Sequence, residues 1–257
     1  QIKNLAKAGW IFGRKDWVKQ AAKVEDILWQ TLVQEDQQGI KLFNTRSANH
    51  SSGEEIMINY ASLAEAELTL GAYADWGVGE RNLDYINRAL KLMKAVETKF
   101  RDNHTVGYFV VSENREDLSV RQKDWFDNAM PAGNSILLQA YAQLEALSEE
   151  PESTNHFHDL SRAYGGLVKN VPHGVAHALD ALTRQTMGWV VVKYRNTDQL
   201  DPLHQEITGT RKSGTQGRPY RPLLLRQDNL IKGFQICVGK NCLNPTKSIE
   251  IAGDYIS

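Results

Sequence analysis

The stretch DWFDNAMPAGNSILLQAYAQLEAL, Asp124 to Leu147, joins a polar loop directly to a long apolar segment. The apolar part is rich in Leu and Ala and predicts a helix over residues 130–147. The acids and amides before that helix, or in its first turn, suit the positive end of the helix dipole. They can also accept hydrogen bonds from the free backbone donors of the first turn. This polar end is therefore either a helix cap or the rim of a binding site.

Most of the chain before Gly188 predicts helices joined by loops. Residues 39–55 contain Gly, Asn and Ser and predict a long loop. Residues 104–112, HTVGYFVVS, predict a short β-hairpin. Further helices are predicted over residues 16–33, 55–76, 81–100, 156–169 and 174–186. In the first of these an apolar stripe is formed by Trp17, Ala21, Val24, Ile27, Leu28 and Leu32.

The character of the sequence changes near Gly188, where β-branched and aromatic residues become frequent. Residues 189–194, 221–226 and 232–239 predict strands, and the polar residues 204–220 predict a loop. We therefore expect a helical-hairpin domain over residues 1–187 and a small mixed or β region over residues 188–257.

Composition excludes several classes of function. The chain has 257 residues, is 41% hydrophobic and carries a formal net charge of -1, so it has a core but no basic footprint for nucleic acid or an anionic membrane. No apolar run approaches the ~18 residues that a membrane-spanning helix needs. Two cysteines are too few for a disulfide-dense secreted scaffold, which predicts a cytoplasmic protein. The opening Gln1 suggests an internal piece of a longer protein or a trimmed product.

Three phrases together resemble one protein family. They are GYF at residues 107–109, DNAMPAGNSILLQAYAQL at residues 127–144 and CVGKNCLNP at residues 237–245. They resemble the C-terminal part of the thioredoxin-domain-containing proteins related to spermatogenesis-associated proteins, over residues 58–245 in patches. In that family a thioredoxin-like domain precedes a toroid of helical hairpins, which is similar to six-hairpin glycosidases and N-acylglucosamine 2-epimerases.

The resemblance implies a mainly α fold, an (α/α) hairpin toroid with a small β-containing C-terminal region. A ring of six hairpins needs about twelve helices, roughly twice the number predicted here, so the chain would hold half of a ring. It would do so as a fragment or as a shortened version. The chain has no thioredoxin Cys-x-x-Cys, so an upstream thioredoxin-like domain would be a partner. Ile58-Asn59 stands where the family usually has an acidic pair.

The resemblance places the polar loop at the mouth of a toroid. Glycoside hydrolysis uses two carboxylates, so Asp124 and Asp127 are the catalytic candidates. The interpretation of these acids as helix caps stays open beside catalysis. The candidates for substrate binding are three aromatic residues for a sugar face and two amides, namely Tyr60, Tyr108, Trp125, Asn128 and Asn134.

Neither a cofactor nor a metal is expected. His173 and His177 have the spacing of two ligands on one helix face, but no third ligand is evident. Cys237 and Cys242 have four residues between them, whereas metal knuckles and redox dithiols usually have two. Reduced structural thiols are therefore favoured over a disulfide.

Three function hypotheses remain. The first is a carbohydrate-active or carbohydrate-binding toroid, related to glycosidases or 2-epimerases, with a sugar-like small molecule as ligand. The second is a non-catalytic helical module that scaffolds a thioredoxin-like domain or another protein, and it predicts an exposed apolar face. The third is a redox protein that cycles Cys237 and Cys242, whose spacing argues against it.

Overall fold

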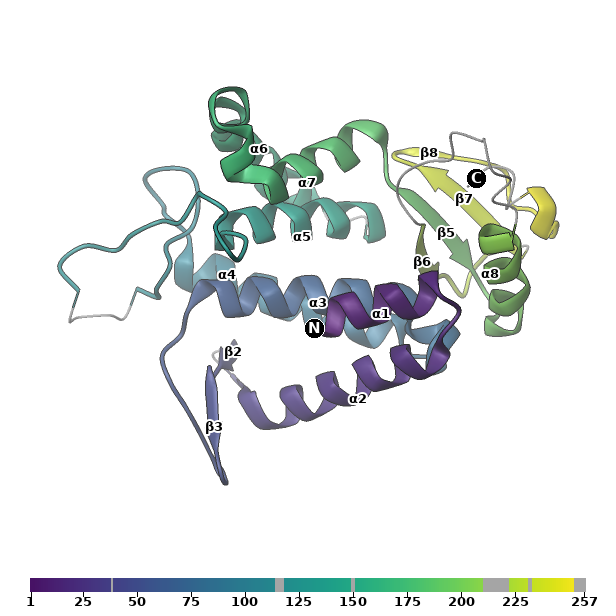
Figure 1. The fold of residues 1–257 in the computed structure, drawn as a ribbon, viewed down its shortest axis with the longest axis horizontal. Helices are drawn as coiled ribbons and strands as arrows, with labels where there is room; N and C mark the ends of the chain where they lie inside the picture. The colour runs from purple at the N-terminus through teal and green to yellow at the C-terminus, as the bar shows by residue number, and fades with distance from the viewer. Residues whose placement is uncertain (38, 114–117, 149–150, 210–221, 231–232, 252–257) are drawn as a thin grey trace. The chain divides into compact units, whose positions relative to one another are not determined.

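Helices form most of the described structure, and one small sheet lies near the C-terminal end of the chain (Figure 1). The computed structural model describes residues 1–37, 39–113, 118–148, 151–209, 222–230 and 233–251. The chain groups into two compact units, each assembled from separate stretches. The first unit comprises Gln1–Lys23, Thr69–Ile86 and Arg184–Ser257, and the second comprises Val24–Leu68 and Asn87–Thr183. The division of the chain between residues 187 and 188 stays a prediction.

The expectation of a mainly helical fold with a small C-terminal sheet is confirmed, and each helix expected before Gly188 is present close to its predicted bounds. None of the described helices is long and apolar enough to cross a membrane. The helices are α1 (Ile2–Ile11), α2 (Lys15–Leu32), α3 (Met57–Gly77), α4 (Asn82–Phe100), α5 (Gly133–Leu147), α6 (Pro151–Asn170), α7 (Ala176–Met187) and α8 (Leu200–Gly209), with 3-10 turns η1 (Pro172–Val175) and η2 (Thr197–Gln199).

Two of these helices are core helices. Almost every residue of α3 and most residues of α5 are buried, which is the pattern of a helix that is packed on all sides. Each forms an antiparallel hairpin with the helix that follows it. Tyr60 near the start of α3 packs against Phe100 at the end of α4, with ring centroids 5.3 Å apart. Tyr141 in the second half of α5 packs against His156 in the first half of α6, with ring centroids 5.2 Å apart.

Helix α2 is rotated relative to its predicted apolar stripe. Val24 and Ile27 of that stripe are 43% and 52% exposed, whereas Glu25 is fully buried. Glu25 Oε2 lies 2.6 Å from Nη1 of Arg88 on α4, and the Arg88 guanidinium lies 4.8 Å from the centre of the Trp29 ring. This ion pair turns a polar position of α2 inward, so part of the apolar stripe faces solvent.

The predicted loop over residues 39–55 is wrong, because two antiparallel β-hairpins form there. In the first, the buried residues Ile40 and Leu42 alternate with exposed ones, which is the two-residue period of a half-buried strand. The Tyr60 hydroxyl accepts the Leu42 amide at 2.8 Å and ties this hairpin to α3. The strands are β1 (Val33–Asp36) with β2 (Gly39–Leu42), and β3 (Thr45–Ser47) with β4 (His50–Ser52).

The hairpin predicted over residues 104–112 does not form among the described residues. Tyr108 makes a single antiparallel bridge with Arg101, and Val111 makes one with Ile56. Gly107, with φ +97°, stands in the left-handed region next to Tyr108. The segment therefore leaves α4 as an irregular loop.

The C-terminal sheet has the strand order β6-β5-β7-β8, and its three predicted strands are confirmed. Its strands are β5 (Val190–Tyr194), β6 (Leu223–Arg226), β7 (Phe234–Val238) and β8 (Asn241–Cys242). β5 pairs in parallel with β6 and antiparallel with β7, and β8 pairs antiparallel with β7.

The loop predicted over residues 204–220 is wrong in its first part, because residues 204–209 belong to α8. Its later part, from residue 210 on, lies outside the described residues. A connection between parallel strands such as β5 and β6 usually contains a helix. His204 of α8 enters the aromatic core of the first unit. Its Nε2 lies 2.7 Å from the Trp10 carbonyl oxygen, and its ring stacks on Trp76 with centroids 4.6 Å apart.

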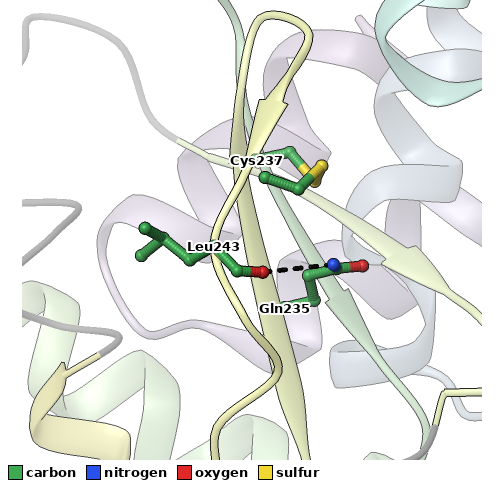
Figure 2. The surroundings of a disulfide bond; sticks show 4 residues. Gln235, Cys237 and Leu243 are labelled. Carbon is green, nitrogen blue, oxygen red and sulfur yellow. Dashed lines mark hydrogen bonds between the residues drawn. A yellow bond between two sulfur atoms is a disulfide. The ribbon is translucent and has the colours of Figure 1, made fainter.

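The expectation of reduced thiols is wrong for this structure, because Cys237 and Cys242 form a disulfide (Figure 2). They are direct cross-strand partners on β7 and β8, with Cα atoms 4.0 Å apart. Gly239, with φ +57°, begins the tight turn that brings them together. One step along the hairpin, Gln235 Nε2 donates to the Leu243 carbonyl at 3.1 Å. Two cysteines whose sequence spacing is unusual for a redox dithiol thus face each other across a hairpin.

The disulfide predicts the thiol content of the protein. Unfolded chain without reductant should show no free thiol to a colorimetric thiol reagent, and reduced chain should show both cysteines. Because the closed loop is short, the C237S/C242S variant should lose about 2 kcal/mol of unfolding free energy in a denaturant titration. Two thiols that react before any reduction would contradict the pairing.

Candidate functional site

A cavity of about 470 Å³ lies between the loop that follows α4 and one face of α6. All of its lining residues belong to the second unit. Its volume lies within the range of ~300–1,000 Å³ that is usual for small-molecule sites. The lining residues come from two stretches, Arg101, Asp102, Asn103, His104, Thr105, Val106, Gly107 and Tyr108 from the loop, and His156, Asp159, Leu160, Arg162 and Ala163 from α6.

Glu97 organises the polar groups next to this cavity. Its Oε1 accepts hydrogen bonds from the hydroxyls of Tyr108, at 2.5 Å, and of Tyr141. Its Oε2 lies 3.3 Å from Arg101 Nη1 and 3.5 Å from His156 Nδ1. An ionised carboxylate only accepts hydrogen bonds, so its four neighbours all face it as donors.

The two tyrosines stay protonated in this cluster. Burial raises the pKa of Tyr108, and the neighbouring Glu97 charge raises it further. Burial likewise raises the pKa of Tyr141 well above its ordinary value. Both phenols therefore remain hydrogen-bond donors to Glu97 over the whole physiological pH range.

His156 is oriented by this arrangement. Glu97 only accepts, and the Tyr108 hydroxyl, 3.5 Å from Nδ1, already donates to Glu97. In the neutral ring, these partners favour the proton on Nδ1 and the lone pair on Nε2. The ring is also held against Tyr141, with centroids 5.2 Å apart and planes 30° apart. His156 thus has the features of a base whose tautomer and orientation are fixed by a carboxylate.

The loop side of the cavity is held by Asp102. Its carboxylate accepts the His104 and Thr105 amides at 2.8 and 3.1 Å and the Thr105 hydroxyl at 2.6 Å. Lys123 Nζ lies 2.7 Å from the same carboxylate and donates to the Val106 carbonyl at 2.7 Å. The hydrogen bonds from Lys123 and Thr105 hold the pKa of Asp102 well below its usual range. Asp102 therefore stays charged, and the loop keeps this shape in mildly acidic solution.

Asn134 and Trp125, two predicted substrate-binding residues, contact the backbone of the loop that follows α4. Asn134 is fully buried. Its Oδ1 accepts the Tyr108 amide at 2.9 Å, and its Nδ2 donates to the carbonyls of Tyr108 and Asp124 at 3.0 and 2.9 Å. Trp125 covers Gly107, where an added Cβ would lie 2.5 Å from the indole ring. Both residues position Tyr108 in the loop that lines the cavity.

Asp127, the first catalytic candidate, joins the starts of two helices. Its Oδ1 accepts the Ala132 amide at 2.9 Å and the Ser135 hydroxyl at 2.6 Å, at the start of α5. Its Oδ2 accepts the His177 amide at 2.8 Å, in the first turn of α7. These three bonds support the capping interpretation of this residue.

The remaining predicted residues lie in different places. Asp124 is half-buried and contributes its carbonyl to the Asn134 network. Asn128 is exposed, and its backbone N–H donates to the Met130 carbonyl at 3.0 Å. Tyr60 is buried beneath β2 and donates to Glu55. Among the predicted site residues, Tyr108 is the one that lines this cavity.

The sequence interpretation did not include Glu97, Arg101, His156 or Asp159 among the site residues. Glu97 lies in the last turn of α4, and Arg101 follows it by four residues, just beyond the helix. His156 and Asp159 are one turn apart on α6. Such spacing is a weak signal that two polar residues share a helix face. Nothing in the sequence indicates that these two helix faces meet at Tyr108.

The two histidines singled out in the sequence, His173 and His177, do not share one regular helix face. His173 lies in the 3-10 turn η1, whereas His177 lies in α7 with its Nε2 3.6 Å from Glu65 Oε1. In the described part of the chain, no three His, Cys, Asp or Glu side chains are grouped so that they could hold a metal ion.

A scan against known protein families finds no match to this chain. A stretch of 130 residues, 51% of the chain, is 29% identical to an uncharacterised protein of Caenorhabditis elegans. The match spans 17% of the length of that relative. This similarity names no activity.

The capping role of Asp127 predicts a stability effect that does not depend on any ligand. Asp127→Ala leaves the amides of Ala132 and His177 without their acceptor, whereas the Ser135 hydroxyl keeps the Ala132 carbonyl at 2.8 Å. The unfolding free energy should fall by about 2 kcal/mol. Asn128→Ala is the matched control, because its exposed side chain should change stability by less than about 0.5 kcal/mol. Urea titrations followed by circular dichroism measure both. Equal stability of the two variants would contradict the capping role.

Proposed function

We propose that this helical module binds a sugar-like small molecule in the cavity between α6 and the loop after α4, and that His156 acts there as a general base. The pairing of His156 with Glu97 carries the proposal, because a carboxylate that fixes an imidazole is the usual support of a catalytic base. Tyr108 and Tyr141 hold that carboxylate in place.

The chemistry of the cavity wall suits a polyhydroxylated ligand. Its lining combines side chains that donate and accept hydrogen bonds, such as Asn103, Thr105 and His104, with apolar surface from Val106 and Leu160. A sugar offers hydroxyls that both donate and accept, and its ring presents an apolar face. The resemblance to carbohydrate-active toroids supports the same ligand class.

Proton transfer fits this site better than glycoside hydrolysis. Hydrolysis needs a carboxyl group that is protonated at neutral pH to serve as the acid. Asp102 is held charged by Lys123 and Thr105, and Asp159 is bound by Arg162 at 2.6 Å. The lone pair of His156 Nε2 can instead take a proton from a carbon next to a carbonyl, and the C–H electron pair moves to the carbonyl oxygen as an enolate. Glu97 then faces the imidazolium that results. This is the chemistry of an epimerase or isomerase.

The hairpins α3–α4 and α5–α6, each with a buried first helix, support the assignment to an (α/α) toroid. In such rings the first helix of each hairpin is the inner one. The described chain would then supply part of a ring, and the rest of a longer protein would complete it.

A second candidate function is a non-catalytic scaffold for a thioredoxin-like domain. The exposed apolar residues Val24 and Ile27 of α2 favour it, because such residues on one helix face suit a protein contact. This candidate requires no ligand in the cavity. The two functions are therefore separated by whether any sugar binds.

The proposed base predicts a kinetic phenotype. Solvent exchange of the proton next to the sugar carbonyl, followed by NMR in D2O over a panel of aldoses and N-acyl sugars, should detect turnover. His156→Gln should reduce the rate by about 100-fold or more while leaving the dissociation constant of the sugar within a few-fold. Glu97→Gln should also reduce the rate, because the imidazole loses its fixed tautomer.

His158→Gln is the matched control, since His158 is exposed on the same helix and does not line the cavity. Its exchange rate should equal that of the unmodified protein. Calorimetric titration with the same panel measures binding separately from turnover. If no sugar binds, or if His156→Gln exchanges as fast as His158→Gln, the proposed function fails.

A further inference from the structure

Each of the four charged side chains that line the cavity has a partner of opposite charge. Arg101 Nη1 lies 3.3 Å from Glu97 Oε2, and Asp102 Oδ2 lies 2.7 Å from Lys123 Nζ. On α6, Arg162 Nη2 lies 2.6 Å from Asp159 Oδ1. With neutral imidazoles, these pairs give this part of the structure no net charge. A charged ligand would have to compete with an existing pair, whereas an uncharged one would not.

We propose that Asp159 is a specificity residue that makes the cavity favour uncharged sugars over sugar acids and sugar phosphates. This inference rests on the proposed function. Asp159 lies between the two arginines of the lining, because its Oδ2 is also 4.0 Å from Arg101 Nη2. It therefore occupies the position at which a ligand carboxylate or phosphate would bind both guanidinium groups.

Asp159 is close enough to the proposed base to contact the same ligand. It follows His156 by three residues on α6, so the two side chains lie on one face of the helix. Both line the cavity. A ligand hydroxyl can donate to the Asp159 carboxylate and leave the arginine pairs intact. A ligand anion is repelled by the Asp159 carboxylate. It can pair with Arg101 and Arg162 only by displacing that carboxylate.

The exposure of these groups sets the size of the effect. The side chains of Asp159, Arg101 and Arg162 are 40%, 43% and 81% exposed. Solvent screens charges at such positions, so one charge changes affinity modestly, by about 5- to 10-fold. The discrimination should weaken further as the salt concentration rises.

The inference is tested by changing one charge without changing the shape of the side chain. Calorimetric titrations with glucose, mannose and N-acetylglucosamine are compared with titrations with glucuronate and glucose 6-phosphate, at low and at physiological salt. In the unmodified protein the uncharged sugars should bind best. Asp159→Asn should tighten binding of the two anions by about 5- to 10-fold and leave the uncharged sugars within about 2-fold. Arg162→Gln should weaken the anions further.

Asp84→Asn on α4 is the control for the same charge change outside the cavity lining, and it should alter no affinity. If the unmodified protein binds glucuronate as tightly as glucose, or if Asp159→Asn leaves their ratio unchanged, the role of Asp159 is overturned while the sugar site stands. If neither the unmodified protein nor Asp159→Asn binds any probe, the proposed function and this inference both fail.

Discussion

In the irregular segment that follows α4, the backbone of Tyr108 depends on one buried side chain, Asn134, for its hydrogen bonds. Buried backbone groups need partners, and a side chain can supply them where no strand does. Asn134 binds both backbone polar groups of Tyr108, as a paired strand would. The cavity follows from this constraint, because Tyr108 fixed in this position can donate to Glu97, and Glu97 in turn orients His156.

A positioning role and a contacting role are difficult to separate in a sequence, and the loop before α5 illustrates the reason. Acids and amides next to a helix start suit both a cap and a binding rim, since both roles need acceptors for backbone or ligand donors. In the structure Asp127 and Asn134 make their bonds to the protein itself. The residues beside the cavity come instead from the ends of helices that are far apart in the chain.

Local patterns predicted the helices α2 to α7 and the three longer strands of the C-terminal sheet well, because periodicity and composition act over a few residues. The errors arose where a distant contact decides the outcome. Glu25 faces inward on α2 because it pairs with Arg88 on α4. The hairpin of β1 and β2 is fixed to α3 by the Tyr60 hydroxyl. The Cys237–Cys242 bond required the register of two strands, which spacing alone does not give. The pairing of Glu97 with His156 is of the same kind, because it joins two helices that are far apart in the chain.

The short hairpin that closes the sheet also affects how the protein behaves among other chains. An edge strand with many unpaired backbone groups can recruit a strand from another molecule and begin aggregation. Here β8 has only two residues and is covalently tied to β7, while Leu243 and Thr246 continue to pair with β7 beyond it. A strand of another chain finds few aligned donors and acceptors along so brief and fixed an edge. The disulfide hairpin thus protects this side of the sheet against intermolecular strand addition.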